Sequence, residues 1–373
     1  MRIAFDARFA LSKSRRGIGN YSLGLLKELI PLLADHEIIL YSDSKCNDAD
    51  IPDSLLSYVR VIGFPFYPLW EQLFLPLALI KDQVDVFHAL GNTAPIFLPS
   101  RVKLILTLHD VMFLKSGIDI PSPANFYQRL GKIYRTLVCP VVARKAHVVL
   151  TVSEFSKRDI VSSIKGIDEG KVAVTYQSCS FLLDEDLIQH KLNAASPALN
   201  ILLFGATDRR KNTKGFIEAF LHFCDHSDAE HSLTIVGLPN KAASLKFKEF
   251  QLHPHFSRLQ FFEFVSASEL RLLFDRCGVL AYPSFYEGFG IPVLEGFATG
   301  CVILASNATS IPEVGGDAAM YFNPHEAIDI SRAMSMLHNN SSLQSDLRLK
   351  GMRRFNYFSW KSVAARTLDS YQF

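Results

Sequence analysis

Short apolar runs alternate with amphipathic stretches along most of the chain. A short run that is apolar almost throughout predicts a strand buried on both faces. In the amino-terminal half these runs are Ile3–Phe5, Ile38–Tyr41, Val84–His88, Leu104–His109 and Val148–Val152. In the carboxyl-terminal half they are Asn200–Phe204, Leu233–Gly237, Leu259–Phe264, Val279–Tyr282 and Val302–Ser306. Helical patterns separate the runs, so we expect β-α-β units and an α/β fold with two parallel sheets.

The segments between these runs give the expected domain boundaries. A helix is expected from about Tyr21 to Leu33, because apolar residues recur there at helical spacing. Residues 181–199 mix acids, Gln, Asn and a proline, which indicates a linker. We therefore expect an amino-terminal domain at 1–180 and a second domain at 200–355. Residues 356–373 have the pattern of a closing amphipathic helix.

Composition excludes several classes of protein. The 373 residues are 49% hydrophobic and 20% charged, which is typical of a folded protein of two domains. A net charge of +2 gives no case for nucleic-acid binding. The six cysteines form no C-x-x-C pair, which argues against a zinc site and suits a reducing cytoplasm. The amino terminus has no apolar signal core, and no run of eighteen apolar residues occurs.

Two loops carry candidate chemistry, and the first is Ser284 to Pro292. It follows an expected strand, contains Gly288 and Gly290, and leads into a helix. A glycine turn before a helix favours phosphate, because N–H groups and the positive end of the helix dipole point at one place. Glu287 and Glu295 lie on either side of this turn and are suited to accept hydrogen bonds from hydroxyls. Phosphates together with hydroxyls indicate a nucleotide sugar; the alternative is that both are ordinary exposed acids.

The second loop follows the strand Asn200–Phe204. It begins at Gly205 and contains Arg210 and Lys211. Paired cations after a glycine turn suit a diphosphate, since arginine can donate to two oxygens and lysine acts as a point charge. A basic surface loop is the alternative. Neither of these two loops contains a D-x-D that could bridge a metal to the diphosphate, so we expect no metal.

These motifs resemble the retaining glycosyltransferases of family 4. Glu287 and Glu295 match the E-x7-E motif of that family. The wider stretch P-S-F-Y-E-G-F-G-I-P-V-L-E-G-F-A-T-G and the later S-I-P-E-V-G-G-D-A-A are similar to it almost residue for residue. The resemblance implies the GT-B fold, with two Rossmann-like domains facing across a central cleft. It also implies transfer of a hexose with retention of configuration.

The resemblance assigns roles to individual residues. Arg210 and Lys211 would neutralise the leaving diphosphate, Glu287 would orient the sugar, and His109 would contact the sugar near the reacting centre. An arginine that many members carry directly after the glycine is replaced by Ala206. The remaining donor-binding residues implied are Gly17, Gly19, Val265, Gly288, Phe289, Gly290, Ile291 and Glu295.

The implied partners are a nucleotide sugar and a saccharide or lipid-linked saccharide acceptor of a surface polysaccharide. GDP-mannose is the first candidate donor, with a UDP- or dTDP-sugar as alternative. No cofactor beyond this substrate is expected. A non-catalytic sugar-binding protein would need export, and a nicotinamide dehydrogenase would need its glycines directly after the first strand, whereas Gly17 and Gly19 come later. A two-carboxylate hydrolase would leave the phosphate-directed loops unexplained.

A contact with the cytoplasmic membrane face is expected through the amino-terminal domain. Residues 1–180 carry 21 Lys and Arg against 17 Asp and Glu. They include the basic helical stretch Asn125–Lys145 and the aromatic stretch Phe64–Trp70. Cations together with amphipathic rings suit a lipid interface. The alternative is that the cations form a solvated face and the aromatic residues line the core.

Overall fold

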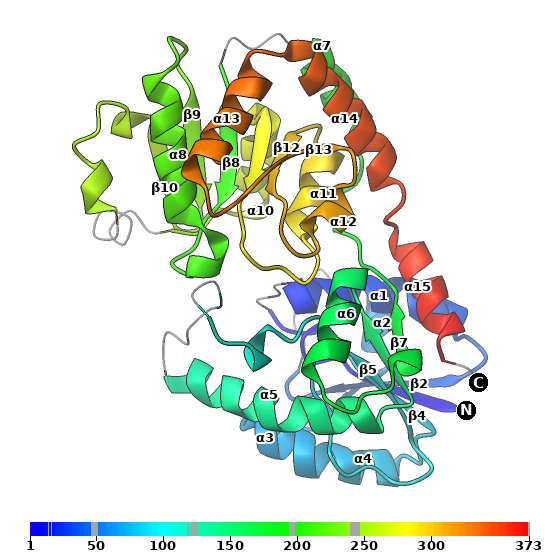
Figure 1. Cartoon of the computed structure of the whole chain (residues 1–373). Coiled ribbons are helices and arrows are strands. Elements are labelled where there is room, and N and C mark those ends of the chain that lie inside the picture. Colours follow the sequence, from blue (N-terminus) through cyan, green and yellow to red (C-terminus); the bar gives the residue numbers. More distant parts are fainter. Residues whose placement is uncertain are drawn as a thin grey trace. The chain divides into compact units, whose positions relative to one another are not determined.

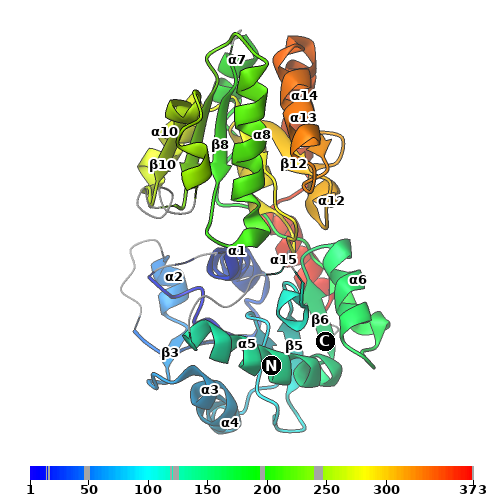
Figure 2. The ribbon, with the colours of Figure 1, turned by 60° about the vertical axis from the view of Figure 1, so that its left-hand side comes forward.

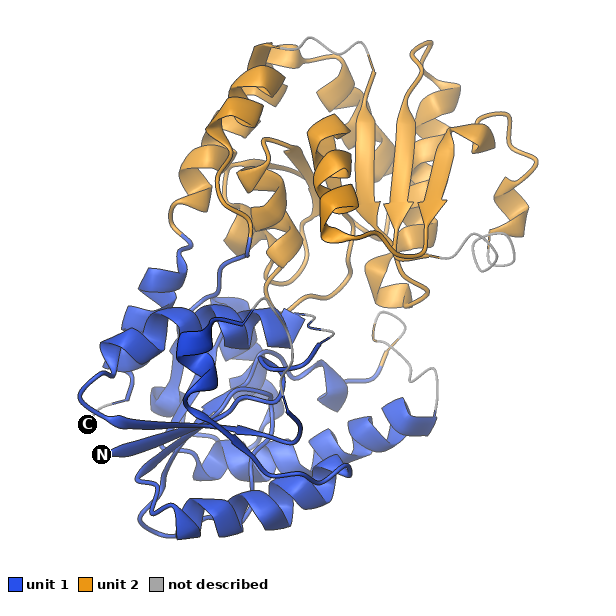
Figure 3. Ribbon diagram, turned by 180° about the vertical axis from the view of Figure 1, so that it is seen from behind, with its two compact units in different colours: residues 1–116, 123–180, 358–373 blue, residues 117–122, 181–357 orange. Residues whose placement is uncertain are grey.

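The computed structural model describes residues 1–13, 15, 17–45, 51–117, 120, 126–193, 198–238 and 247–371. The chain forms two compact units (Figure 3). Unit 1 comprises Met1–Ser116, Pro123–Ser180 and Phe358–Phe373, and unit 2 comprises Gly117–Ser122 and Phe181–Tyr357. The chain therefore returns to unit 1 at its carboxyl end.

Unit 1 is built on a parallel sheet of seven strands in the order β3-β2-β1-β4-β5-β6-β7 (Figure 1). The expected strands are present, with ends that differ by a few residues, and β3 and β7 were not anticipated. The bounds are β1 Arg2–Asp6, β2 Glu37–Ser42, β3 Val59–Val61, β4 Val86–Ala89, β5 Lys103–Thr107, β6 Val148–Thr151 and β7 Val172–Val174.

The helices of unit 1 cover this sheet. The first helix begins at Gly17, not near Tyr21, so Gly17 and Gly19 belong to its first turn. A Cβ on Gly19 would lie 2.7 Å from the Phe9 carbonyl, so only glycine fits this close approach. The bounds are α1 Gly17–Leu32, α2 Asp53–Leu56, α3 Tyr67–Leu69, η1 Trp70–Phe74, α4 Leu75–Lys81, η2 Met112–Leu114, α5 Phe126–Lys145, α6 Glu154–Ser163, η3 Glu169–Lys171 and α15 Trp360–Asp369.

The closing helix α15 is anchored on α1 and on the sheet of unit 1. A Cβ on Gly24 of α1 would collide with the Trp360 ring, so the two helices pack closely. Beyond α15, the hydroxyl of Tyr371 lies 2.8 Å from Nδ1 of His88 on β4. Nε2 of His88 lies 2.8 Å from the hydroxyl of Thr107 on β5. His88 is thus a fully buried, hydrogen-bonded core residue, and burial lowers its pKa to about 3.

Unit 2 is built on a parallel sheet in the order β10-β9-β8-β11-β12-β13 (Figure 2). The order reverses between β8 and β11, and in sheets of this kind ligands bind beyond the strand ends at such a reversal. The strands are β8 Asn200–Phe204, β9 Ser232–Val236, β10 Leu259–Phe262, β11 Val279–Tyr282, β12 Val302–Ser306 and β13 Ala319–Phe322. The last of these was not anticipated.

Helices lie on both faces of the second sheet. Leu304 of β12 faces the core shared with α8 and α13, whereas the preceding Ile303 faces Gly296 of α11. Alternate residues of a strand point to opposite faces, so α11 lies on the face away from α8 and α13. The bounds are α7 Glu185–Asn193, η4 Arg209–Lys211, α8 Thr213–Asp225, η5 Lys248–Phe250, η6 Phe256–Arg258, α10 Ala267–Arg276, α11 Ile291–Ala298, α12 Ile311–Gly315, α13 Ala327–His338 and α14 Ser341–Phe355.

The segment expected as a linker, residues 181–199, contains the helix α7. Its Lys191 is buried, and Nζ donates to the carbonyl oxygens of Phe274 at 2.7 Å and Thr299 at 2.8 Å. Ile188 of the same helix is also buried. These contacts show that the helix is packed into unit 2. A lysine can be buried there because the two carbonyl oxygens accept its hydrogen bonds.

Candidate functional site

The loop expected to bind phosphate joins β11 to α11 in unit 2. Gly290 immediately precedes α11 and has φ 119°, a backbone angle that favours glycine over other residues. Gly288 does not have a positive φ, and Pro292 is the second helical residue, not the first. The first-turn N–H of Ile291 has no acceptor within the helix. The beginning of α11 therefore offers the positive end of a helix, as the sequence predicts.

The two candidate cations follow β8 and lie beside this loop. Oε2 of Glu287 is 2.7 Å from Nη1 of Arg210, and Oε1 is 2.8 Å from Nζ of Lys211. The cations come from the end of β8 and the carboxylate from the end of β11. The reversal of strand order between β8 and β11 brings them together. One carboxylate thus holds both cations in place.

The electrostatics of this cluster keep Glu287 and Arg210 charged. Burial by itself raises the pKa of Glu287, but Lys211 and Arg210 reverse this and lower it to about 2. Burial lowers the pKa of Arg210. The negative charge of Glu287 and the neighbouring Tyr282 raise this pKa by more than burial lowers it, so it lies above its ordinary value. A carboxylate with a pKa so far below neutral cannot act as a proton donor at pH 7. Its role is to hold charge and accept hydrogen bonds.

Several residues that the sequence analysis did not single out fix the loop. The Ser310 hydroxyl donates to the carbonyls of Glu287 at 2.9 Å and Phe289 at 2.8 Å. The Glu287 N–H donates to the Thr309 hydroxyl at 3.1 Å. Nη1 of Arg210 also donates to the Tyr286 carbonyl at 2.9 Å. The sequence signal for these residues is that Ser310 begins the S-I-P-E-V-G-G-D-A-A stretch that resembles family 4, and that Thr309 directly precedes it.

Arg209 is a second residue missed by the sequence analysis. It is the first residue of the tight turn η4 and is exposed, whereas Arg210 and Lys211 are half-buried against Glu287. In the part of the chain that the structure describes, the Arg209 guanidinium makes no ion pair. This leaves one cation beside the cluster that no carboxylate holds.

Glu295 lies in the second turn of α11 and differs from Glu287 in its surroundings. It is half-buried, and among the described residues no side chain or N–H donates to its carboxylate. Burial raises its pKa to about 7. A half-buried carboxylate without donors is poorly solvated, so hydroxyls of a ligand would stabilise its charged form.

The other donor-binding residues expected in unit 2 lie on neighbouring loops. Val265 is half-buried, in the segment between β10 and α10. The next residue, Ser266, caps α10: its hydroxyl accepts a hydrogen bond from the Glu269 N–H, and the Glu269 carboxylate accepts one from the Ser266 N–H. Phe289 is only 2% exposed, so its side chain packs and only its backbone could face a ligand.

The residues expected in unit 1 are Gly17, Gly19 and His109. His109 follows β5, and its Nε2 lies 3.0 Å from the Leu90 carbonyl oxygen. Because a carbonyl can only accept, Nε2 carries the proton and Nδ1 is the nitrogen that can accept a hydrogen bond. Burial lowers the pKa of His109 to about 4, so the ring is neutral at pH 7. Gly17 is exposed, and a Cβ there would meet nothing within 4 Å.

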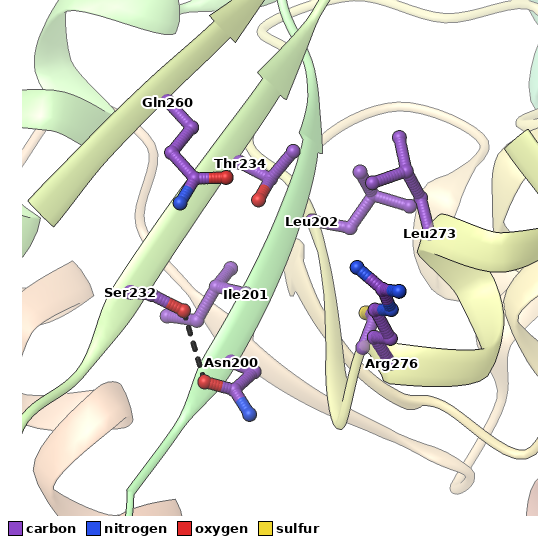
Figure 4. Close-up of a pocket in the computed structure, with 9 residues that line it drawn as sticks. Asn200, Ile201, Leu202, Ser232, Thr234, Gln260, Leu273 and Arg276 are labelled. Atoms are coloured by element: carbon purple, nitrogen blue, oxygen red, sulfur yellow. Dashed lines mark hydrogen bonds between the residues drawn. The ribbon is translucent and has the colours of Figure 1, made fainter. Parts of the chain in front are cut away.

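Unit 2 also contains a pocket of about 250 Å³ that includes none of the expected site residues (Figure 4). It lies over the amino-terminal halves of β8 and β9 and against the end of α10, away from the carboxyl ends of the strands. Asn200, Ser232, Thr234 and Gln260 line its polar side, and Arg276 lies on α10. The described residues contain no group of three His, Cys, Asp or Glu side chains placed to hold a metal ion.

Two sequence families match the chain, one in each half. The family described as Glycosyl transferases group 1 matches residues 184–354. The family described as Glycosyltransferase Family 4 matches residues 15–178. Together the two matched ranges contain every expected site residue.

Curated relatives carry the names of mannosyltransferases. The O-antigen chain mannosyltransferase B of Escherichia coli is 24% identical over 95% of this chain and 96% of its own length. The O-antigen chain mannosyltransferase RfbU of Salmonella typhimurium is 28% identical over 60% of this chain and 62% of its own length. The serotype-specific mannosyltransferase WbdA of Escherichia coli is 35% identical, but over only 31% of this chain and 14% of its own length.

Solved glycosyltransferases share the fold of the whole chain. Sucrose-phosphate synthase from Thermosynechococcus elongatus superposes with a TM-score of 0.71 at 16% identity, covering 100% of this chain and 98% of its own. WaaG, a glycosyltransferase involved in lipopolysaccharide biosynthesis, gives a TM-score of 0.68 at 14% identity, with 99% of each chain covered. The expected fold class, GT-B with two Rossmann-like domains, is confirmed.

Proposed function

This chain belongs to the glycosyltransferases of group 1 and family 4, and we propose that it transfers mannose from GDP-mannose to an acceptor of surface polysaccharide synthesis. The acceptor is a saccharide or a lipid-linked saccharide. The support for mannose is that relatives along most of the chain are named as O-antigen mannosyltransferases. A UDP- or dTDP-sugar is the alternative donor.

The observation that carries the proposal is the cluster at the ends of β8 and β11. Arg210 and Lys211 are held 2.7 and 2.8 Å from Glu287, next to the beginning of α11. As the sugar leaves, negative charge develops on the diphosphate, and preorganised cations and N–H groups lower the energy of that state. We assign this role to Arg210, Lys211 and the backbone of Phe289 to Ile291.

The two carboxylates are assigned to the hydroxyl groups of the donor. Glu295 accepts hydrogen bonds from the ribose, and Glu287 orients the sugar ring. From unit 1, the neutral His109 accepts a hydrogen bond from the sugar through Nδ1. Gly17, Gly19, Gly288, Gly290 and Val265 keep their proposed places along the donor. The anomeric configuration is retained.

The charge compensation is proposed to need no metal ion. A metal bridge would serve to neutralise the leaving diphosphate. Arg210 and Lys211 carry two positive charges to the same place, and the exposed Arg209 adds a third. These cations support metal-independent transfer.

The enzyme is proposed to work in the cytoplasm, with peripheral contact to the inner face of the cell membrane through unit 1. Within the residues that the structure describes, no helix combines the length and apolar character needed to cross a bilayer. The support for membrane contact is the excess of cations in residues 1–180 and on α5.

A donor panel tests the proposed reaction. Release of nucleoside diphosphate would be followed with GDP-mannose, UDP-glucose, UDP-galactose and dTDP-rhamnose in the presence of lipid-linked acceptors. We expect turnover with GDP-mannose and a product whose anomeric configuration, read by NMR, is that of the donor. Lys211→Met should remove turnover while the protein stays folded. Lys214→Met is the matched control, because Lys214 is exposed and pairs with Glu249, which lies outside the cluster. Turnover with another donor alone would replace mannose, and an inverted product would refute retention.

A further inference from the structure

Unit 1 exposes large apolar side chains on two neighbouring helical segments. The first segment is the continuous run α3–η1–α4, and the second is α5. On the first, five apolar residues are each 45–56% exposed: Phe66, Leu69, Leu73, Leu77 and Ile80. On the second, five are 45–84% exposed: Phe126, Tyr127, Leu130, Ile133 and Leu137. We call these ten residues and the two segments the α4–α5 surface.

These side chains are not the core-facing residues of their helices. The first segment already buries Trp70, Leu75 and Leu79 against unit 1. Helix α5 buries Val138 and Val142 in the same core. The exposed apolar residues recur at spacings of three and four, so each segment has an apolar stripe in addition to its buried face. Soluble proteins rarely expose so much apolar surface without a partner.

The two segments lie side by side (Figures 1 and 2). A buried polar cluster joins them. The carboxylate of Glu71 accepts hydrogen bonds from the hydroxyls of Tyr67 and Tyr134 and, at 2.7 Å, from that of Thr93. Nε2 of Gln72 donates to the Tyr134 hydroxyl at 2.7 Å. Because Tyr134 lies on α5 whereas Glu71 and Gln72 lie on η1, this cluster fixes one segment against the other.

The charges of the α4–α5 surface have one sign. The only acid in residues 66–81 is Glu71, which is 1% exposed, and residues 126–145 contain no acid. The exposed charged residues of both segments are all cations: Lys81, Arg129, Arg144 and Lys145. Two further cations of α5, Lys132 and Arg135, are half-buried. Apolar stripes flanked only by cations are complementary to a surface that is apolar within and negatively charged at its border.

We propose that the α4–α5 surface docks on an anionic lipid bilayer, with its apolar side chains among the acyl chains and its cations at the headgroup phosphates. A second copy of the chain is a poorer occupant, because a two-fold contact uses the same surface on both copies and would set cations against cations. The inference deepens the peripheral membrane contact of the proposed function and rests on that proposal. It places unit 1, the unit proposed to meet the acceptor, at the membrane where a lipid-linked acceptor would lie.

Sedimentation with vesicles tests the surface. The full-length protein would be mixed with vesicles of phosphatidylglycerol and phosphatidylcholine, without donor or acceptor. Leu69, Leu73 and Leu77, which are 45–56% exposed, would be replaced together by Gln, which adds no charge. The matched control replaces Leu252, Ile328 and Met336, which are 49–96% exposed on unit 2, by Gln. A third variant carries Gln at Lys81, Arg129 and Arg144.

The expected results separate the apolar from the electrostatic contribution. Wild type and control should sediment with anionic vesicles, and the leucine variant should bind at least about tenfold more weakly. The cation variant should lose on the order of 100-fold in affinity at low salt, since each of the three cations near an anionic surface contributes about fivefold. Affinity for the donor, measured by calorimetry without vesicles, should be unchanged in all variants.

Two results would overturn the proposal. One is equal vesicle binding by the wild type and the leucine variant. The other is a wild-type dimer that the leucine variant converts to a monomer and that vesicles do not compete with, which would make the surface an interface between copies. Loss of donor turnover with intact vesicle binding would instead count against the proposed reaction and leave the surface standing.

Discussion

Donor affinity should depend on pH through Glu295. Burial raises the pKa of this carboxyl to about 7, and no group among the described residues donates to it. Ribose hydroxyls that donate to it favour the ionised form, so the pKa falls when the donor binds. Below pH 7 binding must then release a proton. Affinity should therefore fall as the pH falls and level off above about pH 8.

The size of the effect follows from the pKa of the free protein. With a pKa of about 7, the carboxyl is about one-tenth ionised at pH 6 and about nine-tenths ionised at pH 8. The dissociation constant for GDP-mannose should thus rise about tenfold between pH 8 and pH 6, which is about 1.4 kcal/mol. The diphosphate of a nucleotide sugar is a diester and does not titrate in this range. His109, with a pKa of about 4, does not titrate there either.

Calorimetric titration with GDP-mannose at pH 6, 7 and 8, without acceptor, measures this dependence. Glu295→Gln should bind more weakly at pH 8 by about 0.5–1.5 kcal/mol for each hydrogen bond weakened, and its affinity should be nearly independent of pH. The matched control is Glu326→Gln, an acid outside the loop region. A wild type without pH dependence, or a Glu295→Gln protein that keeps the dependence of the wild type, would refute the assignment of Glu295 to the donor.

Three further predictions concern charge and stability. Turnover should survive EDTA, because Arg210 and Lys211 provide the positive charge; loss on chelation with recovery on Mg²⁺ or Mn²⁺ would show the metal-free proposal to be wrong. Glu287→Gln should lower the free energy of unfolding at pH 7 by roughly 2–3 kcal/mol, as the pKa of this carboxyl is lowered to about 2. The difference in free energy of unfolding between wild type and variant, measured with urea, should become smaller as the pH falls from 5 towards 2. A difference that stays constant would contradict the ion pairs. Lys191→Met should cost about 3 kcal/mol, because two buried carbonyls lose their donor, whereas the exposed Gln189→Met on the same helix should cost almost nothing. Equal thermal stability of these two variants would argue against the anchoring of α7.

The sequence by itself was sufficient for most of the strands, though not for β3, β7 and β13, and for the main loop. Strands of a parallel sheet are covered on both faces, so they are apolar almost throughout, and this local property marked β1, β8 and β11. The glycine turn and its helix could also be predicted, because a positive φ at Gly290 is a demand of the local backbone. The E-x7-E spacing placed Glu287 and Glu295 on either side of that turn.

The tertiary structure decided which residues meet. Lys211 and Glu287 are 76 positions apart, and only the order of the strands sets β8 beside β11 and so brings them together. Helix α7 was interpreted as a linker because its polar residues gave no core pattern. Its buried Lys191 belongs there only because the carbonyls of Phe274 and Thr299 surround it.

The apolar side chains of α4 and α5 show the same limit most clearly. Leu73 and Leu77 have the spacing of a core-facing stripe, and for the aromatic stretch Phe64–Trp70 just before them the sequence alone left core and lipid as alternatives. Periodicity tells which residues share one side of a helix, but it does not tell what packs on that side. Burial is decided by the elements that the fold brings alongside. Here the fold covers Leu75 and Leu79 and leaves Leu73 and Leu77 half exposed.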